Sequence, residues 1–487
     1  MKLLLLNSPW INNEKEYGIK SGTRWAAIRQ KDRSMPYFPF PYFMAWSKTV
    51  LKKVGIEAHI KDAIAEEMTA GACLDYVNGL KPDLVVIEAF TPSIYADLDF
   101  AKTVKEKIGA KVAFCGAHVS ALPEEVLKNL QVDFILIGEY TYALREICSQ
   151  IALGKNDFGL IQGIAFRSNG ALKINPVSNE AENIDDISFP DLDELPMDKY
   201  TEPLSKNFPN AKIVTTKGCP YNCIFCVEPL MYGRTYRKRS VENVIKEIEM
   251  LQEKYGIKEI YFDDAIITIP RAKEIAQEII KNNITIAWTC WMDWNIPLED
   301  MRLLKKSGCI ALKFGVESAN AEIMKTIGKT VYVETVRKAI DNCRKAGILS
   351  HGSFMFGLPG ETKESLKDTN NLAFSIGMDS CQFSIATPLP GTPFHDMAKK
   401  NNWLVAPDWT GYDSLAKSAV SYPGCSKKDI EEAMEEAGRR KIRQFMKNPM
   451  NALRYIWKLY QLNGLNGFIK EVSKKGMFVM RSIGKNK

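Results

Sequence analysis

The sequence predicts an α/β protein with two successive β/α arrays and a helical extension at its C-terminal end. Short apolar runs alternate with longer stretches of helical periodicity over residues 1–155, and the same alternation starts again at about residue 206. Beyond about residue 400 the alternation ends and charged helical sequence follows. With 487 residues, of which 46% are hydrophobic and 25% are charged, the chain has the composition of a globular protein of about three domains.

Residues 1–155 make up the first predicted array. Each of its five apolar runs is followed by a turn residue or a loop and then by helical sequence, which is the pattern of a doubly wound parallel sheet. The runs are 2–7, 56–61, 83–88, 111–115 and 133–137. Such sheets bind ligands at the carboxyl ends of their strands, so Ser93, Gly116, His118 and Gly138 are candidate binding residues. The loops contain no G-x-G-x-x-G sequence, which argues against a nicotinamide cofactor.

Residues 206–400 make up the second array, and a linker over 156–205 separates it from the first. Its apolar runs are 213–216, 259–263, 285–289, 310–315, 349–356 and 382–386. Helical stretches lie between these runs, and the one over 240–255 begins with Ser240, a residue type that caps helix N-termini. The sequence therefore predicts six further β/α units.

Residues 401–487 are predicted as a helical, basic C-terminal region. From Lys441 to Lys487, eleven lysines and arginines stand against a single acidic residue, Glu471, and large apolar side chains interleave with them at roughly helical spacing. Basic amphipathic helices of this kind lie at the surface of anionic membranes. The alternative is that they pack on the second array and leave a solvated basic face. The apolar content and the lack of a recognised nucleic-acid-binding fold argue against nucleic acid as a partner.

The cellular location is predicted from what the sequence carries at its start and in its cysteines. The sequence has no run of about 20 apolar residues, so no membrane-spanning segment is expected. The first apolar run ends at Asn7, which favours a buried strand over a secretion signal. Eleven cysteines without a paired pattern indicate a reducing compartment. We therefore expect a cytoplasmic protein, with contact to the inner membrane surface through the basic C-terminal region.

The run Lys217-Gly-Cys219-Pro-Tyr-Asn-Cys223-Ile-Phe-Cys226 places three thiols within eight residues. Three thiolates can hold three corners of a cubane iron–sulfur cluster and leave the fourth iron open to a small chelating ligand. Structural zinc normally takes four protein ligands, often two C-x-x-C pairs, and the sequence has no second pair. The other cysteines are scattered singly, at Cys73, Cys115, Cys148, Cys290, Cys309, Cys343, Cys381 and Cys425.

This spacing, with Phe225 directly before the last thiol, resembles the radical S-adenosylmethionine enzymes. The resemblance implies a [4Fe-4S] cluster on Cys219, Cys223 and Cys226, whose open iron is chelated by S-adenosylmethionine. An electron from the cluster then cleaves the cofactor to give a 5′-deoxyadenosyl radical. It also implies that the six β/α units form a partial barrel, that the enzyme is anaerobic, and that an external donor such as flavodoxin or ferredoxin supplies electrons.

Two further motifs resemble cofactor contacts of that family at the ends of barrel strands. Asp263-Asp264 ends the second strand, where the family contacts the amino group of the methionine moiety; the alternative is a solvated acidic turn. Gly315-Val-Glu317-Ser318 ends the fourth strand and resembles the family's G-x-E-S element, in which a carboxylate and a hydroxyl can bind the ribose hydroxyls or the methionine group. A glutamate at a strand end can also be structural.

Gly357-Leu-Pro-Gly360 follows the fifth strand and resembles the family's glycine-rich turn against adenine. Glycine allows the backbone to approach a planar base. The alternative is a plain connection between a strand and a helix. Pro388-Leu-Pro-Gly-Thr-Pro393 resembles a segment that follows the sixth strand in members with a cobalamin domain.

The first array resembles the cobalamin-binding-type domain of one subfamily, on the stretch from His118 to Glu125 and on Gly138-Glu139. Domains that ligate cobalt through histidine carry a D-x-H-x-x-G loop, whereas Asp62 is followed by Ala-Ile-Ala-Glu-Glu. The resemblance therefore implies cobalamin without a histidine lower ligand, or a domain that holds no cobalamin. His118 is the best candidate for a cofactor contact, and the alternative is an ordinary loop histidine.

The resemblance covers residues 1 to about 415 and is strongest to the branch with hopanoid-associated enzymes and the anaerobic porphyrin cyclase. It implies a radical enzyme that methylates an unactivated carbon of a small or lipid-like substrate, with methylcobalamin as methyl donor. The alternative is the same radical start followed by rearrangement, ring contraction or oxidative cyclisation. A third possibility is a non-enzymatic electron carrier or cobalamin sensor, against which the barrel motifs argue.

Overall fold

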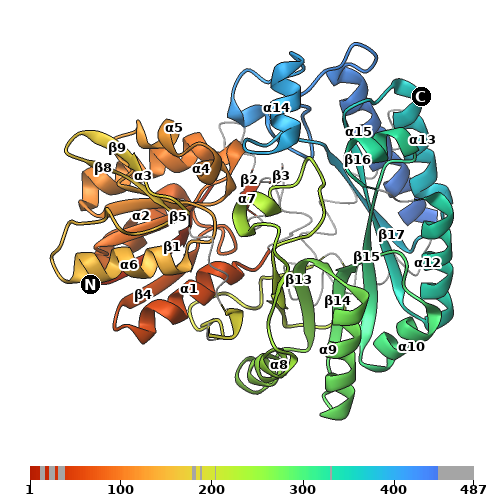
Figure 1. Ribbon diagram of the computed structural model, residues 1–487, viewed down its shortest axis with the longest axis horizontal. Helices are drawn as coiled ribbons and strands as arrows, with labels where there is room; N and C mark the ends of the chain where they lie inside the picture. The colour runs from red at the N-terminus through yellow and green to blue at the C-terminus, as the bar shows by residue number, and fades with distance from the viewer. Residues whose placement is uncertain are drawn as a thin grey trace.

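Two sheets built from the two arrays lie side by side, the first mainly and the second wholly parallel, and helices pack on both (Figure 1). The computed structural model describes residues 1–10, 17–20, 28–30, 39–177, 183–186, 189–202, 204–329 and 332–447. The predicted α/β class, with a doubly wound sheet followed by a six-stranded parallel sheet, is confirmed.

The first sheet has the strand order β4-β1-β5-β6-β7-β8-β9, and its first five strands are parallel. The bounds are β1 (Lys2–Asn7), β4 (Glu57–Asp62), β5 (Leu84–Glu88), β6 (Lys111–Cys115), β7 (Phe134–Leu136), β8 (Ile164–Ser168) and β9 (Ala171–Ile174). The last two strands pair antiparallel and lie within the segment predicted as a linker. The sheet therefore continues past residue 155.

Helices lie on both faces of this sheet, as a doubly wound fold requires. On one face α1 packs against α6, and on the other α2 packs against α3. The helices are α1 (Tyr42–Lys53), α2 (Ala70–Leu80), α3 (Ile94–Ile108), α4 (Ala117–Ala121), α5 (Pro123–Leu127) and α6 (Thr141–Ala152).

The leucines of β1 show how the sequence fills both faces. Side chains alternate along a strand, so Leu4 and Leu6 lie in the core under α2 and α3, and Leu3 and Leu5 lie in the other core. This second core continues without a break through α1 into the second sheet. The two domains therefore share one apolar core.

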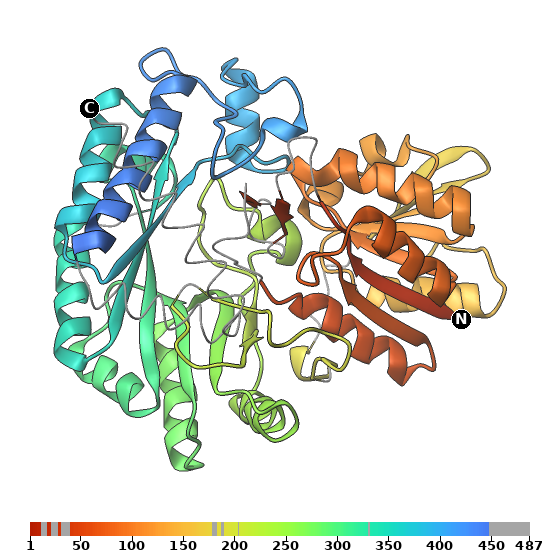
Figure 2. The same cartoon turned by 180° about the vertical axis from the view of Figure 1, so that it is seen from behind.

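The second sheet runs β10-β13-β14-β15-β16-β17, all parallel, with β10 at one edge and β17 at the other. Its helices lie on the outer side, away from the first domain (Figures 1 and 2). The strands are β10 (Asn210–Ile213), β13 (Glu259–Ile267), β14 (Ala287–Met292), β15 (Cys309–Glu317), β16 (Leu349–Phe356) and β17 (Ser380–Ile385). The helices are α8 (Val241–Tyr255), α9 (Ile269–Lys281), α10 (Leu298–Lys306), α11 (Ala321–Thr326), α12 (Val333–Ala346) and α13 (Lys363–Ser375).

Short elements complete the fold. Among the described residues, two separate two-stranded sheets are antiparallel, β2 (Tyr17–Ile19) with β3 (Ile28–Gln30) and β11 (Thr216–Lys217) with β12 (Arg237–Lys238). Helical turns are η1 (Thr91–Ser93), η2 (Ile184–Asp186), η3 (Trp409–Gly411), α7 (Glu228–Tyr232) and α14 (Pro393–Lys400).

The C-terminal region is only partly helical in the described chain. Residues 401–426 carry one helical turn and two isolated bridges, and α15 (Lys427–Lys447) then packs on α13 and β17. The predicted amphipathic tail beyond Lys447 lies outside the described residues. None of the described helices combines the length and the apolar character needed to cross a bilayer.

Candidate active site

The three cysteines lie in one loop that leaves β11 and returns through α7 to β12. Gly218 has φ +79°, and a β-carbon there would collide with the carbonyl oxygen of Thr235, so this position requires glycine. The amide of Cys219 donates to the carbonyl of Gly233 at 3.4 Å. The strand pair therefore closes the base of the cysteine loop.

All three thiols of the cysteine loop are half-buried. Burial raises the pKa of the Cys226 thiol to about 12, with a further increase from Glu228, and burial also raises the pKa of Cys223. Within the described residues, no three side chains of His, Cys, Asp or Glu gather closely enough to hold one metal ion. A cubane does not need that arrangement, because its three thiolates bind three different irons.

Contacts from several strand ends fix the cysteine loop. The Tyr221 hydroxyl donates to Asp293 at 2.8 Å, just after β14. The amide of Ile224 donates to the carbonyl of Ile327 at 3.1 Å, after α11. Phe225 is partly buried against the shared core. The loop is therefore held at the carboxyl ends of the barrel strands, where the sequence places the candidate cofactor contacts.

Asp263 and Asp264 are both engaged with protein groups. The buried carboxylate of Asp264 accepts from the amides of Thr215 and Thr216, at 2.6 and 2.9 Å, and from the Thr215 hydroxyl. Asp263 forms an ion pair of 3.2 Å with Lys212 on β10. Asp264 thus fixes the chain that leads into the cysteine loop, and its predicted contact with S-adenosylmethionine stays a prediction.

Glu317 lies at the end of β15, where the pairing with β16 changes register after Gly315. Its φ is +63°, a left-handed conformation that costs free energy for a residue other than glycine and is concentrated at functional sites. Its Oε1 lies 2.7 Å from the Lys329 ammonium, and both groups shift the pKa of Cys223, so they lie beside the cysteine loop.

Ser318 serves the local structure. Its hydroxyl lies 3.3 Å from that of Thr369 and accepts from the amide of Asn320 at 3.2 Å. Of the predicted pair, Glu317 is therefore the residue with a charged group beside the thiols.

The two glycines after β16 differ in their surroundings. A β-carbon on Gly357 would lie 3.2 Å from Ile430 of α15, so this glycine allows α15 to pack closely. Gly360 is exposed, has φ +91° and has its nearest neighbour, Ile323, at 3.8 Å. The backbone at Gly360 is therefore the part of this turn that a ligand can approach.

Three candidates at the edge of the first sheet take part in packing. The buried Ser93 hydroxyl donates to Asp97 at 2.7 Å. A β-carbon on Gly116 would collide with the carbonyl of Ala89, and one on Gly138 would lie 3.2 Å from the carbonyl of Met231 in α7. Gly138 therefore contacts the second domain.

His118 has the properties of a binding residue. Its Nδ1 lies 3.2 Å from the Thr91 hydroxyl, and its Nε2 is buried without a hydrogen-bond partner. The ring packs edge-to-face with Trp409 at 5.3 Å between centroids. Burial lowers its pKa to about 4, so the imidazole is neutral at pH 7. The unpartnered nitrogen leaves a hydrogen-bonding group available at this edge, and the predicted contact of His118 with a cofactor stays a prediction.

Lys20 lies between β1 and β5, where the strand order of the first sheet reverses and such folds bind ligands. Its ammonium lies 2.6 Å from Asp97, 2.7 Å from the Ser8 hydroxyl and 3.1 Å from the carbonyl of Glu88. Of the other histidines, His59 lies on β4 and His351 on β16, whereas His395 of α14 lies near Trp409, with 6.4 Å between the ring centroids. The Lys20 ammonium is thus held by three protein groups, and His118 and His395 both lie against Trp409.

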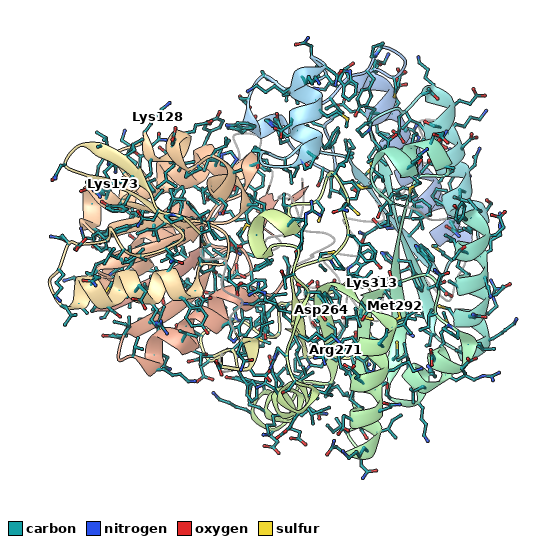
Figure 3. The ribbon with its side chains drawn as sticks, in the orientation of Figure 1. Lys128, Lys173, Asp264, Arg271, Met292 and Lys313 are labelled. Carbon is teal, nitrogen blue, oxygen red and sulfur yellow. The ribbon has the colours of Figure 1, made fainter. Side chains whose placement is uncertain are left out.

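A belt of polar and aromatic side chains crosses the second sheet, with one residue on each of its six strands. Lys313 of this belt lies on β15 in the middle of the barrel (Figure 3). Its ammonium is 3.8 Å from the ring centre of Tyr261 and 3.3 Å from Glu202, a buried linker residue that also pairs with Lys212. The polar belt consists of Lys212, Tyr261, Trp291, Lys313, His351 and Gln382.

Sequence reasoning did not find Lys329, Lys313 or Glu202. A single lysine after Gly328 looks like a surface residue, and Lys313 interrupts an apolar run. The one available signal is the position of Lys313, two residues before Gly315 and four before Glu317. Side chains two residues apart on a strand lie on the same face, so Lys313 is expected to share a face with Gly315 and Glu317.

Residues 213–373 match the radical SAM superfamily. An uncharacterized methyltransferase of Pyrococcus horikoshii is 33% identical over 364 residues, which are 74% of this chain and 78% of that protein. The anaerobic magnesium-protoporphyrin IX monomethyl ester cyclase of Rubrivivax gelatinosus is 28% identical over 366 residues. The match covers 72% of this chain and 64% of the cyclase.

Among solved structures, the cobalamin-dependent S-adenosylmethionine radical enzyme OxsB, with aqua-cobalamin and S-adenosylmethionine bound, matches with a TM-score of 0.70. The match covers 99% of this chain and 71% of that chain, at 16% sequence identity. The two proteins therefore share the arrangement of both domains.

Proposed function

Because the chain belongs to the radical SAM superfamily, we propose that it cleaves S-adenosylmethionine reductively and uses the radical to methylate an unactivated carbon. The observation that carries this proposal is one constellation. Cys219, Cys223 and Cys226 lie half-buried in a loop held at the carboxyl ends of the barrel strands, beside the Glu317–Lys329 ion pair.

The three cysteines would hold a [4Fe-4S] cluster, which supplies the electron for the cleavage when it is bound. The thiols must lose their protons to bind iron, and burial opposes this, so positive charge has to offset the cost. Lys329 brings one such charge close to Cys223. Glu317 offers a carboxylate to the ribose hydroxyls of S-adenosylmethionine. Flavodoxin or ferredoxin is the proposed external electron donor.

The first domain would hold cobalamin, which supplies a methyl group for transfer when it is bound. The shared fold with OxsB supports this, and so does the unpartnered Nε2 of His118 at the ligand-binding edge. In this chain His118 would bind a polar group of the corrinoid, and the Lys20 ammonium would lie at the floor of the site. We propose that no histidine ligates the cobalt from below, because the segment after Asp62 contains none.

The polar belt indicates the polarity of the substrate. Buried charges cost free energy even when they are paired, and Lys212, Lys313 and Glu202 stay inside the barrel as ion pairs. This favours a small or lipid-like substrate that carries at least one polar or charged group into the barrel. The similarity to the porphyrin cyclase supports the alternative outcome, radical cyclisation without methyl transfer. The mass of the product separates the two, because only methylation adds CH₂.

The test is anaerobic purification and reconstitution, followed by iron and cobalt analysis and an assay for 5′-deoxyadenosine or S-adenosylhomocysteine. We expect about four irons per chain and turnover of S-adenosylmethionine. Cys219→Ala, Cys223→Ala and Cys226→Ala should each lose both, and Cys148→Ala, a buried cysteine of the first domain, should keep both. Turnover that persists in the triple variant would contradict the proposal.

A further inference from the structure

We infer that Glu139 is a positioning residue for the cluster, which acts from the first domain on the base of the cysteine loop. This inference rests on the proposed function, which places a cluster on that loop. Glu139 follows β7 at the carboxyl edge of the first sheet. Its Oε2 lies 2.9 Å from Nη2 of Arg237, and its Oε1 forms an ion pair with the Lys217 ammonium, so it joins two cations of the second domain.

The two cations belong to the base of the cysteine loop. Lys217 and Arg237 are directly opposite each other in the β11–β12 pair, and Lys217 is two residues before Cys219. Like charges in that register repel each other. Their side chains are only 2% and 13% exposed, so water does little to separate the charges. The base of the loop therefore needs an anion, and the first domain supplies it.

Other groups of the first domain hold the same base. The Trp46 ring lies 4.4 Å from the Lys217 ammonium. Beyond the last thiol, Gly138 packs on the backbone of α7, and Phe43 stacks on Tyr232 with ring centres 5.1 Å apart. The first domain thus contacts the chain just before the first thiol and just after the last one.

This placement gives Glu139 an electrostatic role that a packing residue would not have. The reduction potential of an iron–sulfur cluster depends on the charge around it, and a nearby cation favours the more negative, reduced state. Removing the Glu139 carboxylate leaves an extra positive charge near the cluster, and removing Arg237 takes one away. The two changes should shift the potential in opposite directions.

The test uses the full chain with its cluster reconstituted anaerobically. Midpoint potentials are measured by redox titration, followed by electron paramagnetic resonance, together with iron content. We expect Glu139→Gln to raise the potential, Arg237→Met to lower it, and the double variant to return close to the parent value. Glu125→Gln is the matched control, because Glu125 also joins the first domain to a later segment, through Trp409 at 2.9 Å, but does not touch the cysteine loop. It should leave the potential unchanged.

Unchanged potentials, or shifts of the same sign in both single variants, would overturn the inference. If Glu139→Gln fails to retain iron, recovery of iron in the double variant supports the inference, and loss of iron in both overturns it. A parent protein that holds no cluster or does not turn over S-adenosylmethionine would instead contradict the proposed function. The two failures are therefore distinguishable.

Discussion

The Lys329 ammonium lies 2.7 Å from Oε1 of Glu317, and this ion pair stands beside the cysteine loop. Glu317 reaches it from a left-handed backbone conformation at a register change in the sheet. Irregular strand ends of this kind redirect a side chain toward a site. The pair therefore presents one anion and one cation to a ligand that carries both a carboxylate and hydroxyl groups, as S-adenosylmethionine does.

We expect Glu317→Gln and Lys329→Met each to weaken binding of S-adenosylmethionine about tenfold or more, which corresponds to about 1.4 kcal/mol. Cluster content should stay close to that of the parent in Glu317→Gln, whereas Lys329→Met loses the positive charge beside Cys223, so its affinity is expressed per bound cluster. Equilibrium binding to the reconstituted protein measures the effect. Lys325→Met changes an exposed lysine of the same segment and should bind normally. Normal affinity in both site variants would return Glu317 to a structural role.

The buried carboxyl group of Glu361 should make the stability of the fold depend on pH. Burial raises its pKa from 4.5 to about 8, against a smaller opposing effect of the Gly357 amide, which donates to it. The folded state thus holds this proton up to about pH 8, whereas the unfolded chain releases it near pH 4.5. Stability should fall as pH rises through that window, by at most about 1.4 kcal/mol per pH unit.

Glu361→Gln removes this titration. Its stability relative to the parent should therefore increase between pH 5 and pH 8, as measured by denaturant unfolding at several pH values. Glu364→Gln, at an exposed position of α13, should follow the parent at every pH. A constant difference between Glu361→Gln and the parent would contradict the raised pKa.

Bound cobalamin should lack a histidine nitrogen on its lower face. The expected electron paramagnetic resonance spectrum of the cob(II)alamin state shows no nitrogen splitting from the protein. If such splitting appears and is lost in His118→Phe, then His118 is the ligand and the prediction is wrong. Absence of cobalt after reconstitution would indicate a domain that holds no cobalamin.

The chain should sediment with anionic liposomes at low salt and be released at high salt. The physical reason is the excess of lysine and arginine beyond Lys447, eight against the single Glu471, combined with large apolar side chains in the same segment. A chain truncated after Lys447 keeps α15 and should no longer sediment. Equal behaviour of the two chains would rule out a membrane role for the tail.

The alternation of apolar runs and helices was sufficient to predict both sheets, because parallel strands buried on two faces read as continuous apolar segments. The strands β13 and β15 are longer than predicted, since Asp264 and Glu317 near their ends are polar and look like loops. The antiparallel pair β8–β9 was missed because its strands have only five and four residues and β9 is exposed along its whole length.

Only the part of the site that has a local sequence signal was predicted. Three thiols in one loop are a local signal, and the loop is where the motif places it. Glu139, by contrast, contacts Lys217 and Arg237, which lie far from it along the chain. No sequence pattern predicts these two ion pairs. Contacts of this kind follow from how the two sheets meet, which local sequence does not encode.

The apolar core that runs from β1 through α1 into the second sheet has a consequence for how the chain can be divided. Trp46 and Tyr42 of α1 lie on the boundary, where each is almost fully buried. A cut between the sheets would expose these rings on one fragment and their partners on the other, and exposed apolar surfaces of that size promote aggregation. The two sheets should therefore melt together in a single cooperative transition, and neither half should be recoverable as an independent soluble fragment.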